Sequence, residues 1–484
     1  MTDSEKRGST GLALKAGIWY VVSTFLVKGL SFITTPIFSR LMSKADYGEF
    51  SNFASWQATL LIIVGAELYN TVNRAYYDFT DDFDGYVSTI TLTSCMISLV
   101  LYISALIGGD LILNIIAIPK QYVHVLFFVL TFQACKQIYL ARERTLYRYK
   151  SVAMMSVCNL VIPTLTAVVL VILSGESSRL AARIYGFYIP SALIGAMCFY
   201  VILKRGRHFK PEYCKYSIKL SLPLIAHYLS AHLLTSSNTI VTKNVLGSQA
   251  VSTVSISSSA NHILTILLQS VSGAVSTWLM DNLNQENVRA VRKGTLLYVG
   301  GVAVVSLGVM LLAPEVIWIL GGSKYAESVY LMPGMVISAM IQSVTTVFTI
   351  ILTYEKKVVK TALYTSVVSA VCILSKIFLL PEYGVIILPY VNICCFGILA
   401  IINYMLVVKA GFGKYINIKG IMAVTGVSLA AMFVCNYLYG HIWIRYSVIG
   451  MLAVIVLAVM YKYRKTILKI INKKLRRKKN NPEE

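Results

Sequence analysis

Long apolar runs alternate with short polar segments along nearly the whole chain. A helix needs about 20 mostly apolar residues to cross the hydrocarbon layer of a membrane. Fourteen such runs can be counted, of which the seventh and eighth are the least apolar. The pattern predicts an all-α polytopic membrane protein with about 14 transmembrane helices, at approximately residues 16–38, 48–71, 87–107, 122–141, 152–173, 180–203, 216–241, 250–280, 294–320, 326–353, 361–379, 384–408, 420–439 and 443–461.

The basic residues predict an orientation, because Lys and Arg concentrate in the cytoplasmic loops of membrane proteins. With 14 spans, one side of the membrane receives 32 of the 44 Lys and Arg residues. The other side receives nine, among them Arg183, Lys376 and Arg445. We therefore expect both termini in the cytoplasm, with membrane lipids as partners of a basic tail that lies on anionic headgroups.

Composition excludes a soluble protein. The 484 residues are 57% apolar and only 13% charged, where a soluble protein carries about 25% charged residues. The net charge of +23 does not indicate a nucleic-acid partner, because the basic residues lie in short loops between apolar runs. The nine cysteines form no CxxC pair, and no nucleotide-binding, metalloprotease or hydrolase motif is present. No cofactor, metal site or catalytic residue is therefore expected.

Charged residues inside the predicted spans are rare and mostly basic. A charge at mid-membrane costs about 2.5–3.5 kcal/mol on insertion scales, so such residues usually face a cavity. In the first span, Lys28 lies on a polar stripe with Thr24 and Ser31, which favours a cavity wall that meets an anion. The alternative is a lysine that reaches towards the membrane surface or bonds a neighbouring helix.

Two further polar groups lie in the second and fourth spans. Glu67, Asn70 and Arg74 follow at spacings of three and four, and Glu67 is the one acid well inside an apolar run. Glu67 is a candidate gate or coupling residue, although pairing with Arg74 within the helix explains it equally well. In the fourth span, Lys136 and the neighbouring Gln133 form a polar patch.

The eighth span carries a polar stripe with alternating spacings of three and four. It either lines water or joins helices through small residues, and its hydroxyl and amide groups also suit a sugar. The seventh span carries His227 and His232 on different faces, so one can line a cavity while the other packs. The stripe consists of Ser255, Ser258, His262, Thr265, Gln269, Ser272 and Ser276.

The stretch from Tyr20 to Gly48 resembles the opening of bacterial polysaccharide-type flippases for lipid-linked oligosaccharides. These belong to the multidrug/oligosaccharidyl-lipid/polysaccharide (MOP) exporter superfamily. The matching elements are the Lys28–Gly29 pair, the Pro36–Arg40 segment and the tripeptide Asp46-Tyr47-Gly48, followed by Asn73 to Phe79 at the exit of the second helix. A weak internal parallel exists between Asp46-Tyr47-Gly48 and Gly247-Ser248-Gln249, about 200 residues later, each entering a predicted span.

The resemblance implies two six-helix bundles around a central cavity, working by alternating access, with an extra pair of helices at the C-terminal side. The implied segments are a cytoplasmic N-terminus at 1–15, an N-terminal bundle at 16–203, a cytoplasmic linker at 204–215, a C-terminal bundle at 216–408, the extra pair at 420–461 and a basic cytoplasmic tail at 462–484.

The resemblance also implies a function. The expected cargo is a polyprenyl-pyrophosphate-linked oligosaccharide, moved across the bacterial cytoplasmic membrane for cell-surface polysaccharide biosynthesis, so the protein is expected to be a transporter and not an enzyme. Further expected partners are a polysaccharide polymerase or glycosyltransferases and a proton or sodium gradient. The family's cationic cavity residues correspond to Lys28 and, by position, to Arg74, Lys136, His227 and His262. Polar lining is expected from Thr24, Ser31, Asn70, Ser258, Thr265 and Gln269.

Two other functions stay open at this point. A multidrug antiporter of the same superfamily would bind organic cations and would need buried acids, which only Glu67 supplies. A membrane enzyme that polymerises the glycan has little support in the sequence. The acids of the second half all lie in or beside loops, which argues against an ion site there: Asp281, Glu286, Glu315, Glu327, Glu355 and Glu382.

Overall fold

The chain folds almost entirely into helices. The computed structural model describes residues 29, 32–355, 358–454, 458 and 461. Within these residues there is no strand, and nine helical stretches are long and apolar enough to cross a membrane. The all-α polytopic fold is therefore confirmed. Thr24, Lys28 and Ser31 lie outside the described residues, as do segments 1–15 and 462–484.

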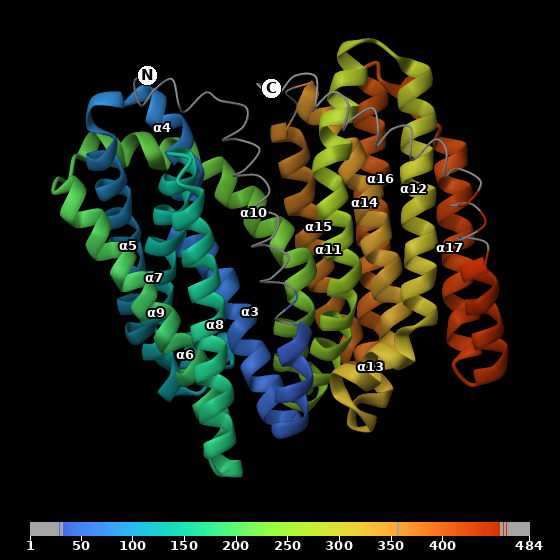
Figure 1. The fold of residues 1–484 in the computed structure, drawn as a ribbon, viewed down its shortest axis with the longest axis horizontal. Coiled ribbons are helices and arrows are strands. Elements are labelled where there is room, and N and C mark those ends of the chain that lie inside the picture. The colour runs from blue at the N-terminus through green and yellow to red at the C-terminus, as the bar shows by residue number, and fades with distance from the viewer. Residues whose placement is uncertain (1–28, 30–31, 356–357, 455–457, 459–460, 462–484) are drawn as a thin grey trace.

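The N-terminal helices form one bundle, drawn in blue and green on the left of Figure 1. Residues 32–41 are helical and lead into this bundle. Its further elements are α3 (Lys44–Gly65), η1 (Leu68–Thr71), α4 (Val72–Asp78), η2 (Thr80–Asp82), α5 (Phe83–Ile107), α6 (Gly109–Ile116), α7 (Lys120–Thr145), α8 (Tyr149–Leu173), η3 (Glu176–Ser178) and α9 (Arg179–Gly206).

The second bundle follows on the right of Figure 1, in yellow to orange, and α17 lies at its outer side. Its elements are α10 (Pro211–Leu246), α11 (Ser248–Asn284), α12 (Val288–Leu311), α13 (Ala313–Gly321), η4 (Ser323–Leu331), α14 (Met332–Tyr354), α15 (Val358–Tyr383), η5 (Gly384–Ile386) and α16 (Ile387–Lys409). After it come η6 (Gly413–Tyr415), α17 (Ile418–Leu438) and a helix at Ile442–Val454.

Helix α10 joins the two bundles. Its first turns pack on the N-terminal bundle, where Tyr213 belongs to a buried cluster that also contains residues of α5 and α7. Just before the helix, Lys210 Nζ donates to Asp82 Oδ2 over 2.5 Å, and this hydrogen bond raises the pKa of Lys210. The segment between α9 and α10 is thus only residues 207–210, shorter than the predicted 204–215, because both helices continue into it.

At one end of the molecule the two bundles touch, and we call this contact the closed end; it lies at the bottom of Figure 1. A Cβ atom added to Gly48 of α3 would lie 1.8 Å from the carbonyl oxygen of Ser248, so the backbones of α3 and α11 meet here without a side chain between them. Ser248 Oγ donates to Glu49 Oε1 over 2.6 Å, and Lys243 forms an ion pair with the same carboxylate.

More contacts hold the closed end together. Lys44 Nζ donates to Glu327 Oε1 over 2.8 Å, and Lys324 Nζ donates to the carbonyl oxygen of Met42 over 2.5 Å. Phe38 and Met42 share one buried apolar cluster with Tyr325 of the second bundle. Both polar and apolar contacts therefore hold the two bundles together at this end.

Two predicted spans differ from the observed helices. The span expected at 294–320 ends at Leu311, and α13 begins separately, because Pro314 in its first turn cannot continue the preceding helix. The span expected at 48–71 is interrupted where Ala66 and Glu67 adopt left-handed backbone angles, with φ of 45° and 52°. The helix therefore ends at Gly65 and resumes as η1 and α4.

Three basic residues that the charge count treated as loop charges do not lie in exposed loops. Arg183, Lys376 and Arg445 are all buried, at 7%, 0% and 4% exposure. Arg183 lies one turn inside α9 and Lys376 lies inside α15, within the spans predicted at 180–203 and 361–379. Arg445 pairs with Glu315 of α13.

Candidate functional site

A cavity of about 490 Å³ lies between the two bundles, next to the closed end. Both bundles line it, and most of the polar groups are hydroxyls and amides. No Asp or Glu is among its lining residues in the part of the chain that the structure describes. These are Thr34, Thr35, Phe38, Tyr47, Phe50, Ser51, Ala54, Ser55, Ser156, Asn159, Leu160, Thr164, Ala167, Arg183, Phe187, Tyr188, Thr239, Ser255, Ser258, Ser259 and His262.

The one Lys or Arg among these lining residues is Arg183, which the sequence analysis missed as a site residue. Its guanidinium carbon lies 3.6 Å from the ring centre of Phe50, 4.2 Å from that of Phe38 and 4.8 Å from that of Tyr47. Each cation–π contact of this kind contributes about 0.5–2 kcal/mol. Aromatic rings thus hold this buried cation in the cavity wall.

Lys136 lies behind the cavity wall in the N-terminal bundle. Its Nζ donates to Asn159 Oδ1 over 2.6 Å and to Ser191 Oγ over 3.4 Å, and Asn159 itself lines the cavity. A hydrogen bond of 2.6 Å from Gln57 to Gln133 continues the polar groups towards α3. Lys136 therefore reaches the cavity only through Asn159.

The eighth-span stripe divides between two pockets. Ser258 and His262 line the central cavity, whereas Thr265 and Gln269 line a smaller pocket of about 130 Å³ between α11, α12 and α14. Thr265 Oγ1 lies 3.5 Å from Nδ1 of His262, so the two pockets are one helical turn apart. The polar face of α11 thus continues from the cavity along the helix, away from the closed end.

An apolar groove adjoins the smaller pocket on the outer surface of α11 and α12. Its volume is about 660 Å³, and Leu268 and Tyr298 line both. Trp278 fills the space beside Gly294, while Gly301 leaves one side of the groove without a side chain. The groove is therefore suited to an apolar chain.

The remaining predicted site residues lie outside the cavity lining. Arg74 is exposed on α4 and pairs with Asp78, with 3.3 Å between Nε and Oδ2. Glu67 is buried at the helix interruption and accepts a hydrogen bond of 2.6 Å from Asn70. His227 is half-buried on α10.

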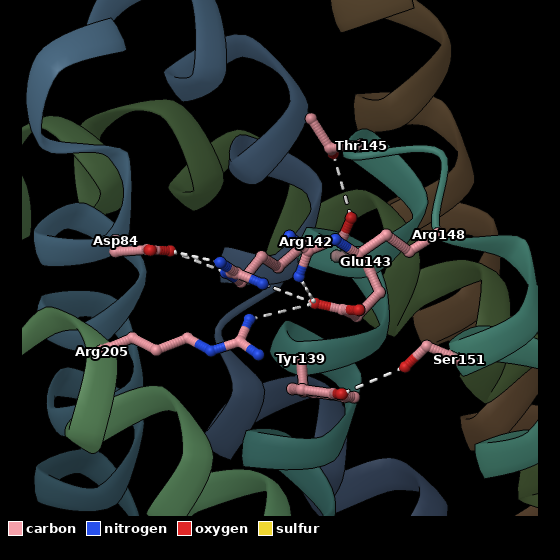
Figure 2. Close-up of polar contacts among 9 residues, drawn as sticks. Asp84, Tyr139, Arg142, Glu143, Thr145, Arg148, Ser151 and Arg205 are labelled. Atoms are coloured by element: carbon pink, nitrogen blue, oxygen red, sulfur yellow. Dashed lines mark hydrogen bonds and ion pairs between the residues drawn. The ribbon is translucent and has the colours of Figure 1, made fainter. Parts of the chain in front are cut away.

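At the end opposite the closed end, a cluster of charges ties the N-terminal bundle together (Figure 2). The buried carboxylate of Glu143 on α7 pairs with Arg142 at 2.5 Å, and with Arg148 and Arg205 at 3.6 Å each. Arg142 also donates to Asp84 of α5 over 2.7 Å. The cluster therefore connects α5, α7, α9 and the segment before α8.

The sequence matches a family model described as polysaccharide biosynthesis protein over residues 13–279. The chain belongs to this family. No curated protein matches it. The structure is similar to that of "Lipid II flippase MurJ, inward closed conformation", with a TM-score of 0.70 and 16% identity, over 93% of this chain and 100% of that chain.

A second similar structure is an inward-facing multidrug resistance MATE family transporter of the MOP superfamily. Its TM-score is 0.59 at 13% identity, over 81% of this chain and 98% of that chain. At such identities the similarity concerns the fold. This member of the polysaccharide biosynthesis protein family therefore has the fold of the MOP superfamily, and the predicted resemblance is confirmed.

Proposed function

We propose that this protein is a flippase that moves a polyprenyl-pyrophosphate-linked oligosaccharide from the cytoplasmic to the outer leaflet of a bacterial cytoplasmic membrane. The observation that carries the proposal is the cavity between the bundles, which offers hydroxyls, amides and one buried arginine but no acid among its described lining residues. Hydroxyl and amide groups can replace water around a sugar, and a guanidinium suits a phosphate. The family's description as polysaccharide biosynthesis protein supports the same class of cargo.

We assign alternating access to the protein because, among the described residues, the backbones of α3 and α11 meet at one end of the molecule. The closed end is the outer end in this proposal, since the opposite end carries the basic residues of 204–215 that the positive-inside rule assigns to the cytoplasm. Opening the outer end requires the contacts between Gly48 and Ser248 and between Glu49 and Lys243 to break. Lys28, which the family resemblance assigns to the cavity, remains a proposed second cation.

The lipid tail of the cargo has a place outside the cavity. The polar face of α11 leads from His262 past Thr265 to the apolar groove beside α12. A headgroup in the cavity and an isoprenoid chain in this groove would each meet a matching surface. The buried Glu67 at the helix interruption of the N-terminal bundle is our candidate for a gate or for coupling to a proton or sodium gradient.

The proposal can be tested by deleting the gene in its host and measuring which lipid-linked glycan accumulates, and on which leaflet. Complete repeat units trapped on the cytoplasmic leaflet would support a flippase. Accumulation on the outer leaflet would favour a polymerising enzyme, and no accumulation would favour drug export. Complementation should fail with Ser258→Trp, which fills the cavity, and succeed with Ser270→Trp on the same helix, which is not among the lining residues.

A further inference from the structure

Arg183 uses only part of its capacity to bind other groups. Its side chain is 7% exposed, its Nε has no hydrogen-bond partner, and it forms no ion pair with a carboxylate among the described residues. One amino group donates to Met42 Sδ over 3.4 Å, and sulfur is a weak acceptor. The hydroxyl of Tyr47 is a further, uncharged partner of the guanidinium. A buried charge without an opposite charge is unfavourable, so an anion that enters the cavity gains a partner at this position.

We propose that Arg183 binds a phosphate group of the cargo at the deep end of the cavity, and that this binding loosens the closed end. The inference rests on the proposed function, because it identifies the bound phosphate as part of a lipid-linked sugar. A guanidinium presents parallel N–H groups that match two phosphate oxygens. The described wall around it adds hydroxyls and no acid, so an anion meets no repulsion there.

The second half of the proposal follows from what holds Arg183. Phe38 and Tyr47, two of the rings on which it stacks, belong to the buried cluster that crosses between the bundles at the closed end. Tyr47 packs edge-on against Tyr325 of the second bundle, with 6.2 Å between ring centres, and the next residue is Gly48 at the contact with α11. A phosphate that draws the guanidinium away from these rings therefore removes support from the residues that join the bundles.

Binding is measured first, with the full-length protein in nanodiscs and farnesyl pyrophosphate as the probe. Wild type should bind, Arg183→Gln should lose affinity by at least about tenfold, and Arg183→Lys should keep part of it, because a lysine retains the charge without the planar fork. The matched control is Arg179→Gln. Arg179 lies one turn earlier on α9, donates to the carbonyl oxygen of Leu41 over 2.6 Å and is not among the lining residues.

Opening is measured in the same samples by the distance between two spin labels at the closed end. Suitable positions are the exposed Leu173 of α8 and Tyr383 of α15, labelled through an unnatural amino acid because the chain has nine cysteines. Farnesyl pyrophosphate should lengthen the distance in wild type and in Arg179→Gln. It should leave Arg183→Gln unchanged.

Each outcome decides the proposal. Equal affinity of wild type and Arg183→Gln, or equal losses in Arg183→Gln and Arg179→Gln, would overturn it. If Arg183→Gln does not fold, Arg183→Lys carries the test, and wild-type affinity and opening in that variant would equally refute the need for a guanidinium. Wild-type binding of inorganic pyrophosphate but not of farnesyl pyrophosphate, with the same dependence on Arg183, would support an anion site while contradicting the lipid-linked cargo. Loss of binding in Arg183→Gln with unchanged opening would refute the link to the closed end.

Discussion

The sharpest test of the closed end is Gly48→Ala. The added Cβ would lie 1.8 Å from the carbonyl oxygen of Ser248, whereas real Cβ contacts essentially never fall below 3.0 Å. The neighbour is backbone, so no side chain can turn away, and the two bundles must separate at this point. Overpacking of this kind costs about 1–3 kcal/mol, which shifts a two-state equilibrium by roughly 5- to 150-fold.

The cost falls on one state only. Once the bundles have parted at the closed end, residue 48 has no contact with Ser248, and Ala is favoured over Gly within a helix by about 0.8–1.0 kcal/mol. Gly48→Ala should therefore fold at least as stably as wild type while populating the form in which the bundles have parted at the closed end. Under the proposed flippase function export should fall, because a transporter that cannot close this end cannot return to collect cargo.

The assay is the spin-label distance between positions 173 and 383 in nanodiscs, without ligand. The long-distance population should grow in Gly48→Ala. Gly273→Ala on α11 is the control, because no atom lies within 4 Å of its added Cβ. A distance distribution in Gly48→Ala identical to that of wild type would refute the reasoning, since the contact would then not be part of the closed state in the membrane.

Three further outcomes are expected. Lys243→Met alone should open the closed end more than the double variant Lys243→Met with Glu49→Gln, because the single change leaves the half-buried carboxylate of Glu49 without its partner. The distance between the same two spin labels measures the opening. Gly301→Leu should fill the groove and slow the flipping of a long-chain lipid-linked glycan in proteoliposomes, whereas Gly308→Leu, on the same helix outside the groove, should not; equal rates would exclude the groove as the seat of the tail. Glu143→Gln should lower the melting temperature in detergent through a loss of about 3 kcal/mol, because three arginines lose a shared buried carboxylate; an unchanged melting temperature would show that the cluster adds no stability.

The apolar runs predicted the fold well, because crossing a membrane demands a length and a composition that few other structures need. They could not predict the interruption at Ala66 and Glu67. The polar residues Glu67, Asn70 and Arg74 follow at spacings of three and four, which a continuous helix also shows, so they do not mark a break. In the structure the residues after the break contact α7 and α10, which lie far away in the sequence. The same limit applies to α13, although Pro314 within a predicted span was a visible signal.

The candidate site was only partly predictable. The stripe on α11 predicted a common polar face for Ser258 and His262, and both line the cavity in the structure. Arg183 was missed because the charge count treated it as an outer loop residue, although it lies inside the span predicted at 180–203. Its aromatic partners Phe38 and Phe50 lie more than 130 positions away in the sequence, so only the fold brings them to it.

Two ion pairs at the closed end differ in how much they stabilise the closed state. We expect one of them to limit the opening. Lys44 and Glu327 are 29% and 60% exposed, so water and salt screen their attraction and their pair contributes at most about 1 kcal/mol. Lys243 and Glu49 are 14% and 20% exposed, and Ser248 binds the same carboxylate beside the close contact at Gly48. Breaking this second pair leaves two poorly hydrated charges, so the closed end should open only when another interaction compensates for their separation. The tripeptides Asp46-Tyr47-Gly48 and Gly247-Ser248-Gln249 both lie at the start of a helix. They therefore meet beside the ion pair that contributes most to keeping the end closed.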